Sequence, residues 1–128
     1  RSLEQLMPMD VSDEGFRHVG RCEQLQHLWC MYCRDTTDKA TEHIAALKHL
    51  KTYYAGQTLI SNRSLEILGK MDSLEVLQFW NVGGISSEGI AALARLPRLR
   101  EVSFDGCSKI SPEAMTVFPP HVQVNFSA

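Results

Sequence analysis

Hydrophobic positions along the chain are grouped around single hydroxyl residues that recur at a nearly constant interval. The hydroxyl residues stand 25, 24, 25 and 25 positions apart, and they are Ser12, Thr37, Ser61, Ser86 and Ser111. A Ser or Thr oxygen can accept a hydrogen bond from an unpaired N–H group in the first turn of a helix. The spacing therefore predicts five helices, each with one of these residues as its N-cap.

Apolar residues surround these hydroxyl residues at fixed distances, except before and four positions after Thr37, where Thr36 and Thr41 stand. One stands directly before it, one four positions after it and one seven positions after it, as Ile60, Leu65 and Leu68 do around Ser61. The first two have the spacing of a hydrophobic staple, which four of the five units keep, and the last two extend one apolar stripe along the helix. The position three after the hydroxyl always holds a small residue, as expected where neighbouring units approach closely. These residues are Gly15, Ala40, Ser64, Gly89 and Ala114.

A second repeating pattern precedes each predicted helix from the second unit onward. A leucine stands 11 or 12 positions before the hydroxyl residue, followed by an apolar residue three positions later and another two positions after that. The first members are Leu25, Leu50, Leu74 and Leu99, the second are Leu28, Tyr53, Leu77 and Val102, and the third are Cys30, Ala55, Phe79 and Phe104. Alternation of period two is typical of a strand with one buried face.

Together the two patterns predict an α/β fold, a solenoid of about five strand–turn–helix repeats with a parallel sheet on its concave face. No unit could bury its apolar face alone, so residues 1–128 form a single domain, either complete or part of a longer chain. At the start, Leu6 lies closer to Ser12 than the standard unit has it, and Pro8 lacks the N–H of a central strand, which predicts an edge strand. At the end, Pro119 and Pro120 stop the fifth helix. A last strand of open register is then predicted around Val122, Val124 and Phe126.

A family resemblance rests on residues 74–79 (LEVLQF) and 85–93 (ISSEGIAAL), followed by residues 99–107 (LREVSFDGC) and 110–111. These segments resemble the cysteine-containing leucine-rich repeat. That repeat is known from F-box substrate receptors, from the mitochondrial ATP-synthase coupling factor B and from bacterial leucine-rich-repeat proteins. The resemblance implies an architecture for gripping other proteins, in adaptor or assembly-factor roles, and no common chemistry.

Composition and charge narrow the classes of partner. The chain is 44% hydrophobic and 22% charged, as expected for a folded domain. Its formal net charge is -2, so the chain has no excess of positive side chains to bind the phosphates of a nucleic acid. We therefore expect no nucleic-acid partner. Apolar stretches last only a few residues, so we also expect no membrane insertion.

Four cysteines and five histidines raise the question of a metal, because Cys30 and Cys33 have the two-residue gap of a zinc half-site. The repeat offers another explanation, in which Cys30 takes the inward strand position of Phe79, and Cys33 the position after the strand that Cys107 also takes. Cys22 likewise takes a position held by leucine or methionine in other units. We therefore predict four small core residues, with no metal and no cofactor. Unpaired buried thiols suit the cytoplasm or another reducing compartment, the mitochondrial matrix included.

Nucleophilic catalysis finds no support in the pattern. The repeated serines are assigned as caps, and the chain has no G-x-S-x-G elbow. Asp13 and Asp38 lie at predicted helix starts, where the helix dipole explains them without a cation. His18, His43 and His49 fall on predicted helices or return segments, whereas His27 is predicted to share the inner wall with Trp29. We therefore predict that the chain is not an enzyme.

The strand residues that alternate with the inward ones are not needed for the core of the repeat. They face the solvent on the concave side. Trp29, Tyr54 and Trp80 stand there on adjacent predicted strands, which lie about 4.8 Å apart, so these rings should form one patch. Exposed aromatic patches mark interfaces. Glu101 and Asp105 form an acidic flank. The predicted partner-binding residues are His27, Trp29, Met31, Tyr54, Gln78, Trp80, Glu101 and Asp105.

The predicted function is therefore a protein- or peptide-binding module, adaptor or assembly-factor-like, that uses the concave sheet face. The alternative is a structural scaffold segment. In that case the aromatic face packs on a further domain or on a second copy of the chain, which would make the protein a homo-oligomer.

Overall fold

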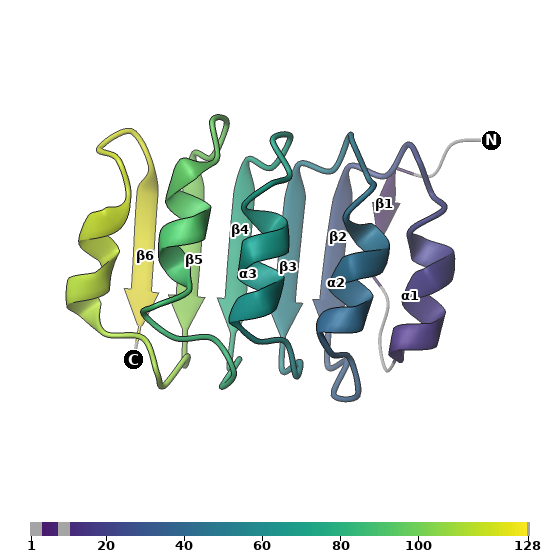
Figure 1. The fold of residues 1–128 in the computed structure, drawn as a ribbon, viewed down its shortest axis with the longest axis horizontal. Coiled ribbons are helices and arrows are strands. Elements are labelled where there is room, and N and C mark those ends of the chain that lie inside the picture. The colour runs from purple at the N-terminus through teal and green to yellow at the C-terminus, as the bar shows by residue number, and fades with distance from the viewer. Residues whose placement is uncertain (1–3, 8–10, 128) are drawn as a thin grey trace.

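Strands and helices alternate along the chain in the computed structural model, which describes residues 4–7 and 11–127 (Figure 1). The strands are β1 (Gln5–Leu6), β2 (His27–Met31), β3 (Thr52–Gly56), β4 (Val76–Trp80), β5 (Glu101–Asp105) and β6 (Gln123–Ser127). The helices are α1 (Asp13–Val19), α2 (Asp38–Ile44) and α3 (Asn62–Leu68), with the 3-10 helices η1 (Ile90–Arg95) and η2 (Pro112–Val117). All six strands are parallel and lie in chain order, which confirms the predicted solenoid.

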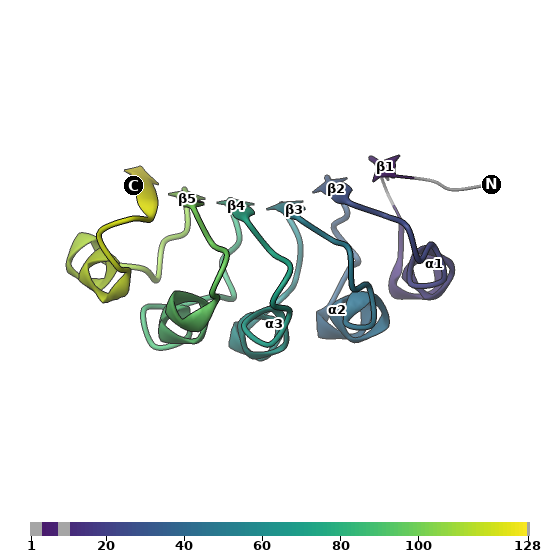
Figure 2. The same ribbon diagram turned by 90° about the horizontal axis from the view of Figure 1, so that it is seen from above.

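The strands and helices form two layers, which Figure 2 shows from above. The row of strands bends away from the helices toward both ends, so the sheet lines the inner, concave side and the helices the outer side. Each crossover from one strand to the next carries one helix, and all helices lie on the same face of the sheet. The opposite face of the sheet is left without a covering layer from the described residues.

The register of the sheet keeps equivalent residues of successive repeats side by side. Leu28 pairs with Tyr53, Tyr53 with Leu77, and Leu77 with Val102. The end strands follow the same register, since Leu6 pairs with Leu28 and Val102 with Val124. β1 is a two-residue edge strand, as predicted, and β6 settles the register that the sequence leaves open. Pro8 lies outside the described residues.

The core lies between the sheet and the helices and consists of the repeating apolar positions. The leucines that precede the strands are at most 1% exposed, and so are Leu77 and Phe79. The rings of Phe79 and Phe104 stack across neighbouring strands with centroids 5.4 Å apart. Burial of the same positions in every central unit confirms the predicted inside and outside of the strands.

The helices differ from the prediction in the fourth and fifth units. Thr37 and Ser61 are N-caps whose hydroxyls accept from the backbone N–H two residues on. Ser12 and Ser111 occupy N-cap positions without such a bond. The assignment of Ser86 as an N-cap is wrong, because its backbone forms a β-bridge with Lys109 and the helix η1 begins only at Ile90.

Hydrogen bonds between neighbouring units form a ladder along the starts of the helices. The residue that directly follows the hydroxyl residue of one unit forms hydrogen bonds with the hydroxyl residue of the next unit. The pairs are Asp13 with Thr37, Asp38 with Ser61, Asn62 with Ser86, and Ser87 with Ser111. Asp13 and Asp38 thus accept bonds from the next repeat, a role that the helix dipole alone did not predict. The hydroxyl row serves mainly to join the units.

A buried polar chain explains why the second unit has Thr41 where other units have an apolar residue. The hydroxyls of Thr41 and Ser64 are 2.6 Å apart, and Ser64 donates to Asp38 at 2.6 Å. Tyr53 hydrogen bonds with Thr41 on the other side, and burial raises the pKa of the Tyr53 hydroxyl well above its usual value. Thr41 and Ser64 are at most 1% exposed and Tyr53 is 2% exposed, so these hydrogen bonds satisfy polar groups that water cannot reach.

Three of the four cysteines lie in the core as predicted. Cys30, Cys33 and Cys107 are buried, whereas Cys22 is half-buried, which corrects its assignment as a core residue. No disulfide joins any of the four, all of which the structure describes. Burial raises the pKa of the Cys30 thiol well above its usual value, and the neighbouring Cys33 adds to the rise.

Candidate functional site

The predicted partner-binding residues lie on the concave face, in three rows that run across the strands. His27, Thr52, Val76 and Glu101 form the first row, Trp29, Tyr54, Gln78 and Ser103 the second, and Met31, Gly56, Trp80 and Asp105 the third. The inward neighbours of these residues are buried, whereas the row residues whose side chains are described are half-buried or exposed, Gly56 apart. The side chain of Met31 is not among those described.

One cluster of side chains lies at the start of the concave face on β2 and β3. The rings of His27 and Trp29 stack with centroids 5.7 Å apart and planes 17° from parallel. His27 Nδ1 lies 3.0 Å from Thr52 Oγ1, which ties the imidazole to β3. This hydrogen bond gives His27 a structural role beside any contact with a partner.

A second cluster lies at the carboxyl ends of the strands, over Gly56. The ring of Trp80 meets the ring of Tyr32 edge to face, with centroids 5.8 Å apart and planes at 86°. A Cβ on Gly56 would lie 3.0 Å from Trp80 Cε3 and 3.4 Å from Tyr54 Cε2. The missing side chain at Gly56 therefore makes room for two rings to lie close above the strand. We call Tyr32, Tyr54 and Trp80 the aromatic corner.

The aromatic corner lies beside a carboxylate. Trp80 pairs with Asp105 in the register of β4 and β5. The pKa of the Tyr54 hydroxyl is raised, first by burial and then by the charge of Asp105 and by Tyr32. Asp105 and Tyr32 thus both act on the hydroxyl of Tyr54.

Tyr32 is the residue of this site that sequence analysis missed, because the strand alternation ends at Met31. Its backbone has a left-handed φ of 59°, and its N–H donates to the carbonyl of Gly56 at 3.1 Å. One residue of each central unit has the same conformation directly after its strand, and these residues are Tyr32, Gln57, Asn81 and Gly106. Asn and Gly adopt a left-handed φ readily. Asn81 and Gly106 at this position therefore indicated that the residue after the strand has a left-handed φ in all four units.

Gln78 and Glu101 flank the corner without joining it. Gln78 is half-buried in the second row, between Tyr54 and Ser103. Glu101 lies in the first row and accepts from the amide of Asn125 at 3.5 Å. Of the eight predicted residues, Tyr54, Trp80 and Asp105 thus meet at the corner, while Trp29 stacks on His27 and pairs with Tyr54 in the register of β2 and β3.

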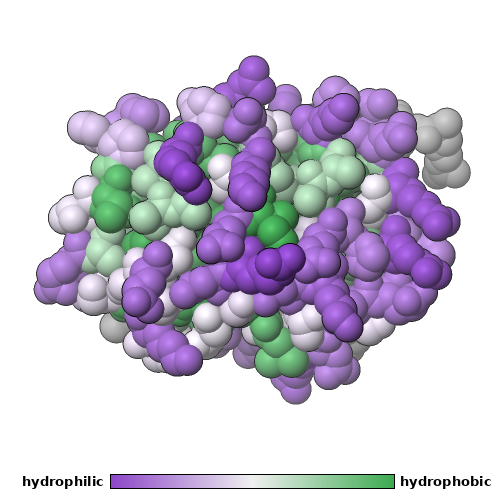
Figure 3. Space-filling view, viewed as in Figure 1, coloured by the Kyte–Doolittle hydropathy of each residue, from purple (hydrophilic) through white to green (hydrophobic). Residues whose placement is uncertain are grey.

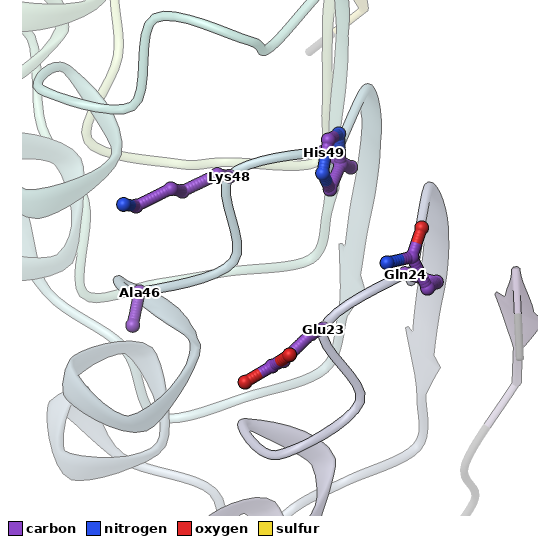
Figure 4. Close-up of a pocket in the computed structure, with 5 residues that line it drawn as sticks. All are labelled: Glu23, Gln24, Ala46, Lys48 and His49. Carbon is purple, nitrogen blue, oxygen red and sulfur yellow. The ribbon is translucent and has the colours of Figure 1, made fainter. Parts of the chain in front are cut away.

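Elsewhere the surface offers less chemistry. Figure 3 shows that the helix side is mostly hydrophilic, with small apolar patches. A hollow of about 250 Å³ lies between the loops before β2 and β3, lined by residues such as Glu23, Lys48 and His49 (Figure 4).

Within residues 4–7 and 11–127, no three His, Cys, Asp or Glu side chains gather to hold a metal ion. Across the same residues, no helix is long and apolar enough to cross a membrane.

Comparisons with known proteins place the chain by fold. No family model matches it. A chain in the crystal structure of the yeast Rad7 and Elc1 complex has a similar structure, with a TM-score of 0.77, 14% identity, and coverage of 94% of this chain and 31% of that chain. Such a likeness shows the fold alone, and with the six-stranded parallel sheet it defines a leucine-rich-repeat-like solenoid. The cysteine-containing type of repeat stays a prediction from the sequence.

One curated relative shares sequence with the chain. It is a Caenorhabditis elegans protein described as "Putative RNA-binding protein EEED8.10", 30% identical over 81 residues. The match covers 60% of this chain and only 11% of that protein. The chain therefore corresponds to a small part of this relative.

Proposed function

We propose that this chain is a protein- or peptide-binding module of adaptor type, not an enzyme, and that its concave sheet face contacts the partner. The observation that carries the proposal is the position of Trp80, half-buried on the open face of the sheet and edge to face with Tyr32. A large ring is not needed there for folding, since the equivalent positions in β3 and β5 hold Gly56 and Asp105.

The physical argument rests on the cost of binding. Rings held on a rigid sheet lose little conformational freedom when a partner covers them, and they bury a large area. Tryptophan and tyrosine are enriched among the residues that dominate interface energies. Trp29, Tyr54 and Trp80 on three adjacent strands supply such residues within one face.

RNA and a second copy of the chain are the two alternatives to a different protein as the ligand. The name of the Caenorhabditis elegans relative favours RNA, whose bases could stack on the same rings. Against RNA, the formal net charge of the chain is -2. A second copy of the chain is the other competitor, because the concave face of one copy could cover that of another. The yeast structure, a complex of Rad7 and Elc1, supports a protein partner by analogy of fold only.

The test presents all three ligands to the same protein. Random peptides displayed as a library are selected on the immobilised chain, and their affinities are measured by fluorescence anisotropy. Labelled single-stranded homopolymer RNAs are titrated in parallel, and light scattering measures the mass of the protein over a hundredfold range of concentration. Each selected peptide is measured again on Trp80→Ala and, as a matched control, on Val117→Ala in η2, where Val117 is 42% exposed.

The proposal expects peptides that bind the parent and Val117→Ala equally and bind Trp80→Ala much more weakly. RNA binding that Trp80→Ala abolishes, with no peptide selected, would replace the protein partner by RNA. A dimer that dissociates in Trp80→Ala would support the scaffold alternative instead.

A further inference from the structure

We propose that the aromatic corner binds a cationic side chain, lysine or arginine, of the protein partner, and that Asp105 is its counter-ion. This inference rests on the proposed function and names the chemistry that the concave face recognises. It goes beyond the patch of rings predicted from the sequence, because it depends on Tyr32 and on how the rings meet.

The geometry of the rings suits a cation. Tyr32 and Trp80 stand at 86° to one another, so their faces are turned in different directions around a shared corner. Tyr54 approaches Trp80 from the same strand as Gly56, and the glycine leaves room for both rings. A cation gains most when it rests on the face of a tryptophan or tyrosine within about 6 Å of the ring centre, and rings at an angle offer more than one such face.

The charges around the corner also favour a cation. The concave positions of β2 to β5 contain two carboxylates, those of Glu101 and Asp105, and neither lysine nor arginine. Asp105 is exposed, and its carboxylate has no hydrogen bond or ion pair to any residue among 4–7 and 11–127. By contrast, Glu42 and Glu75 each pair with an arginine. Asp105 is thus an unpaired anion beside the rings of Trp80 and Tyr54.

The combination matters because each part alone is weak. An exposed ion pair contributes little, and an exposed cation–π contact contributes about as little. A ligand that covers the corner would exclude water from both contacts, which strengthens each of them. An apolar partner, in contrast, would cover Asp105 without compensating its lost hydration.

The first experiment uses a small cation and its neutral counterpart. Choline and 3,3-dimethylbutan-1-ol have the same shape apart from the charge, and each is titrated into the ¹⁵N-labelled chain while the indole N–H signals are followed. We expect millimolar choline to shift the Trp80 signal and the alcohol to bind about three- to thirtyfold more weakly. Asp105→Asn should weaken choline binding several-fold, whereas Val117→Ala on η2, away from the concave face, should leave it unchanged. Equal binding of choline and the alcohol overturns the inference.

The second experiment asks whether the cation comes from a protein. In the peptides selected above, each lysine is replaced by norleucine, which keeps the four-carbon chain without the ammonium group, and each arginine by citrulline, which keeps the shape without the charge. One replacement should lower affinity about tenfold on the parent and much less on Asp105→Asn. If peptides bind through Trp80 but tolerate every replacement, the cation inference is wrong and the proposed function stands. If choline shifts Trp80 and no peptide binds, the protein source of the cation and the proposed function are both wrong.

Discussion

Asp38 holds Ser61 of the next repeat by two hydrogen bonds, one from the backbone N–H at 2.8 Å and one from the hydroxyl at 2.6 Å. Asp13 holds Thr37 in the same way, at 2.7 Å and 2.6 Å. In the next unit the amide of Asn62 accepts from the N–H of Ser86 and donates to its hydroxyl. Each bond crosses from one unit to the next, so the ladder contributes to the interface between repeats and not to the helix alone.

We predict that Asp38→Ala lowers the free energy of unfolding by about 1–3 kcal/mol, because it leaves Ser61 and the buried Ser64 without their acceptor. Asp38→Asn should cost less, since Asn62 already makes the equivalent pair of bonds with Ser86. Urea unfolding measures both variants. The control is Asp35→Ala, an exposed residue of the preceding loop, for which we expect a change within about 0.5 kcal/mol. Equal losses at Asp35 and Asp38 would contradict the role of the ladder.

Acid should weaken the same contact. Burial opposes ionisation of Asp38, but the hydrogen bonds from Ser61 and Ser64 outweigh it and lower the pKa of its carboxyl below the usual value. A group whose pKa is lower in the folded state stabilises the fold above its unfolded pKa, about 3.9, and this stability is lost as the pH falls through the folded pKa. The difference in unfolding free energy between the parent and Asp38→Asn should therefore be constant near neutral pH and shift against the parent below about pH 4. A difference that stays the same down to pH 2 would show that Asp38 gains nothing from ionisation.

Thiol reactivity should separate one cysteine from three. Cys22 is half-buried, while Cys30, Cys33 and Cys107 are buried. Burial also raises the pKa of the thiols of Cys30 and Cys107, so less of each exists as the reactive thiolate. Titration of the native protein with a chromogenic disulfide should modify Cys22 first, and all four should react in denaturant. Rapid reaction of Cys30 in the native protein, or stoichiometric zinc in a metal analysis, would contradict the core assignment.

Leu77 should be far more important to stability than a residue of the outer helix layer. Its side chain is fully buried between neighbouring strands, so Leu77→Ala should cost about 2–5 kcal/mol. Lys39 is exposed on α2, and Lys39→Ala should cost less than about 0.5 kcal/mol. Chemical denaturation of both variants checks the assignment of inside and outside, and two equally mild changes would reverse it.

The tryptophans of the concave face should affect binding more than folding. We expect Trp29→Ala and Trp80→Ala to change the melting temperature little, because both residues are only half-buried, whereas their neighbours along the strand are buried in the core. For a selected peptide, either variant should weaken binding by roughly 2 kcal/mol or more, about thirtyfold in affinity. Calorimetry of unfolding and anisotropy of binding measure the two effects separately. A variant that unfolds the domain would place that tryptophan in the core, and normal binding by both would move the site to the helix side.

The sequence by itself determined the solenoid and the orientation of its strands. Strand alternation and the interval between units are local properties of the chain, and they predicted that Leu77 faces the core and Trp80 the concave side. Tertiary structure decided what local pattern does not contain. Ser86 begins no helix because its backbone bridges to Lys109, and Asp38 finds its partner Ser61 in the next repeat. Tyr32 joins the site only because β2 and β4 flank Gly56, a relationship between three strands that no single unit of the sequence specifies.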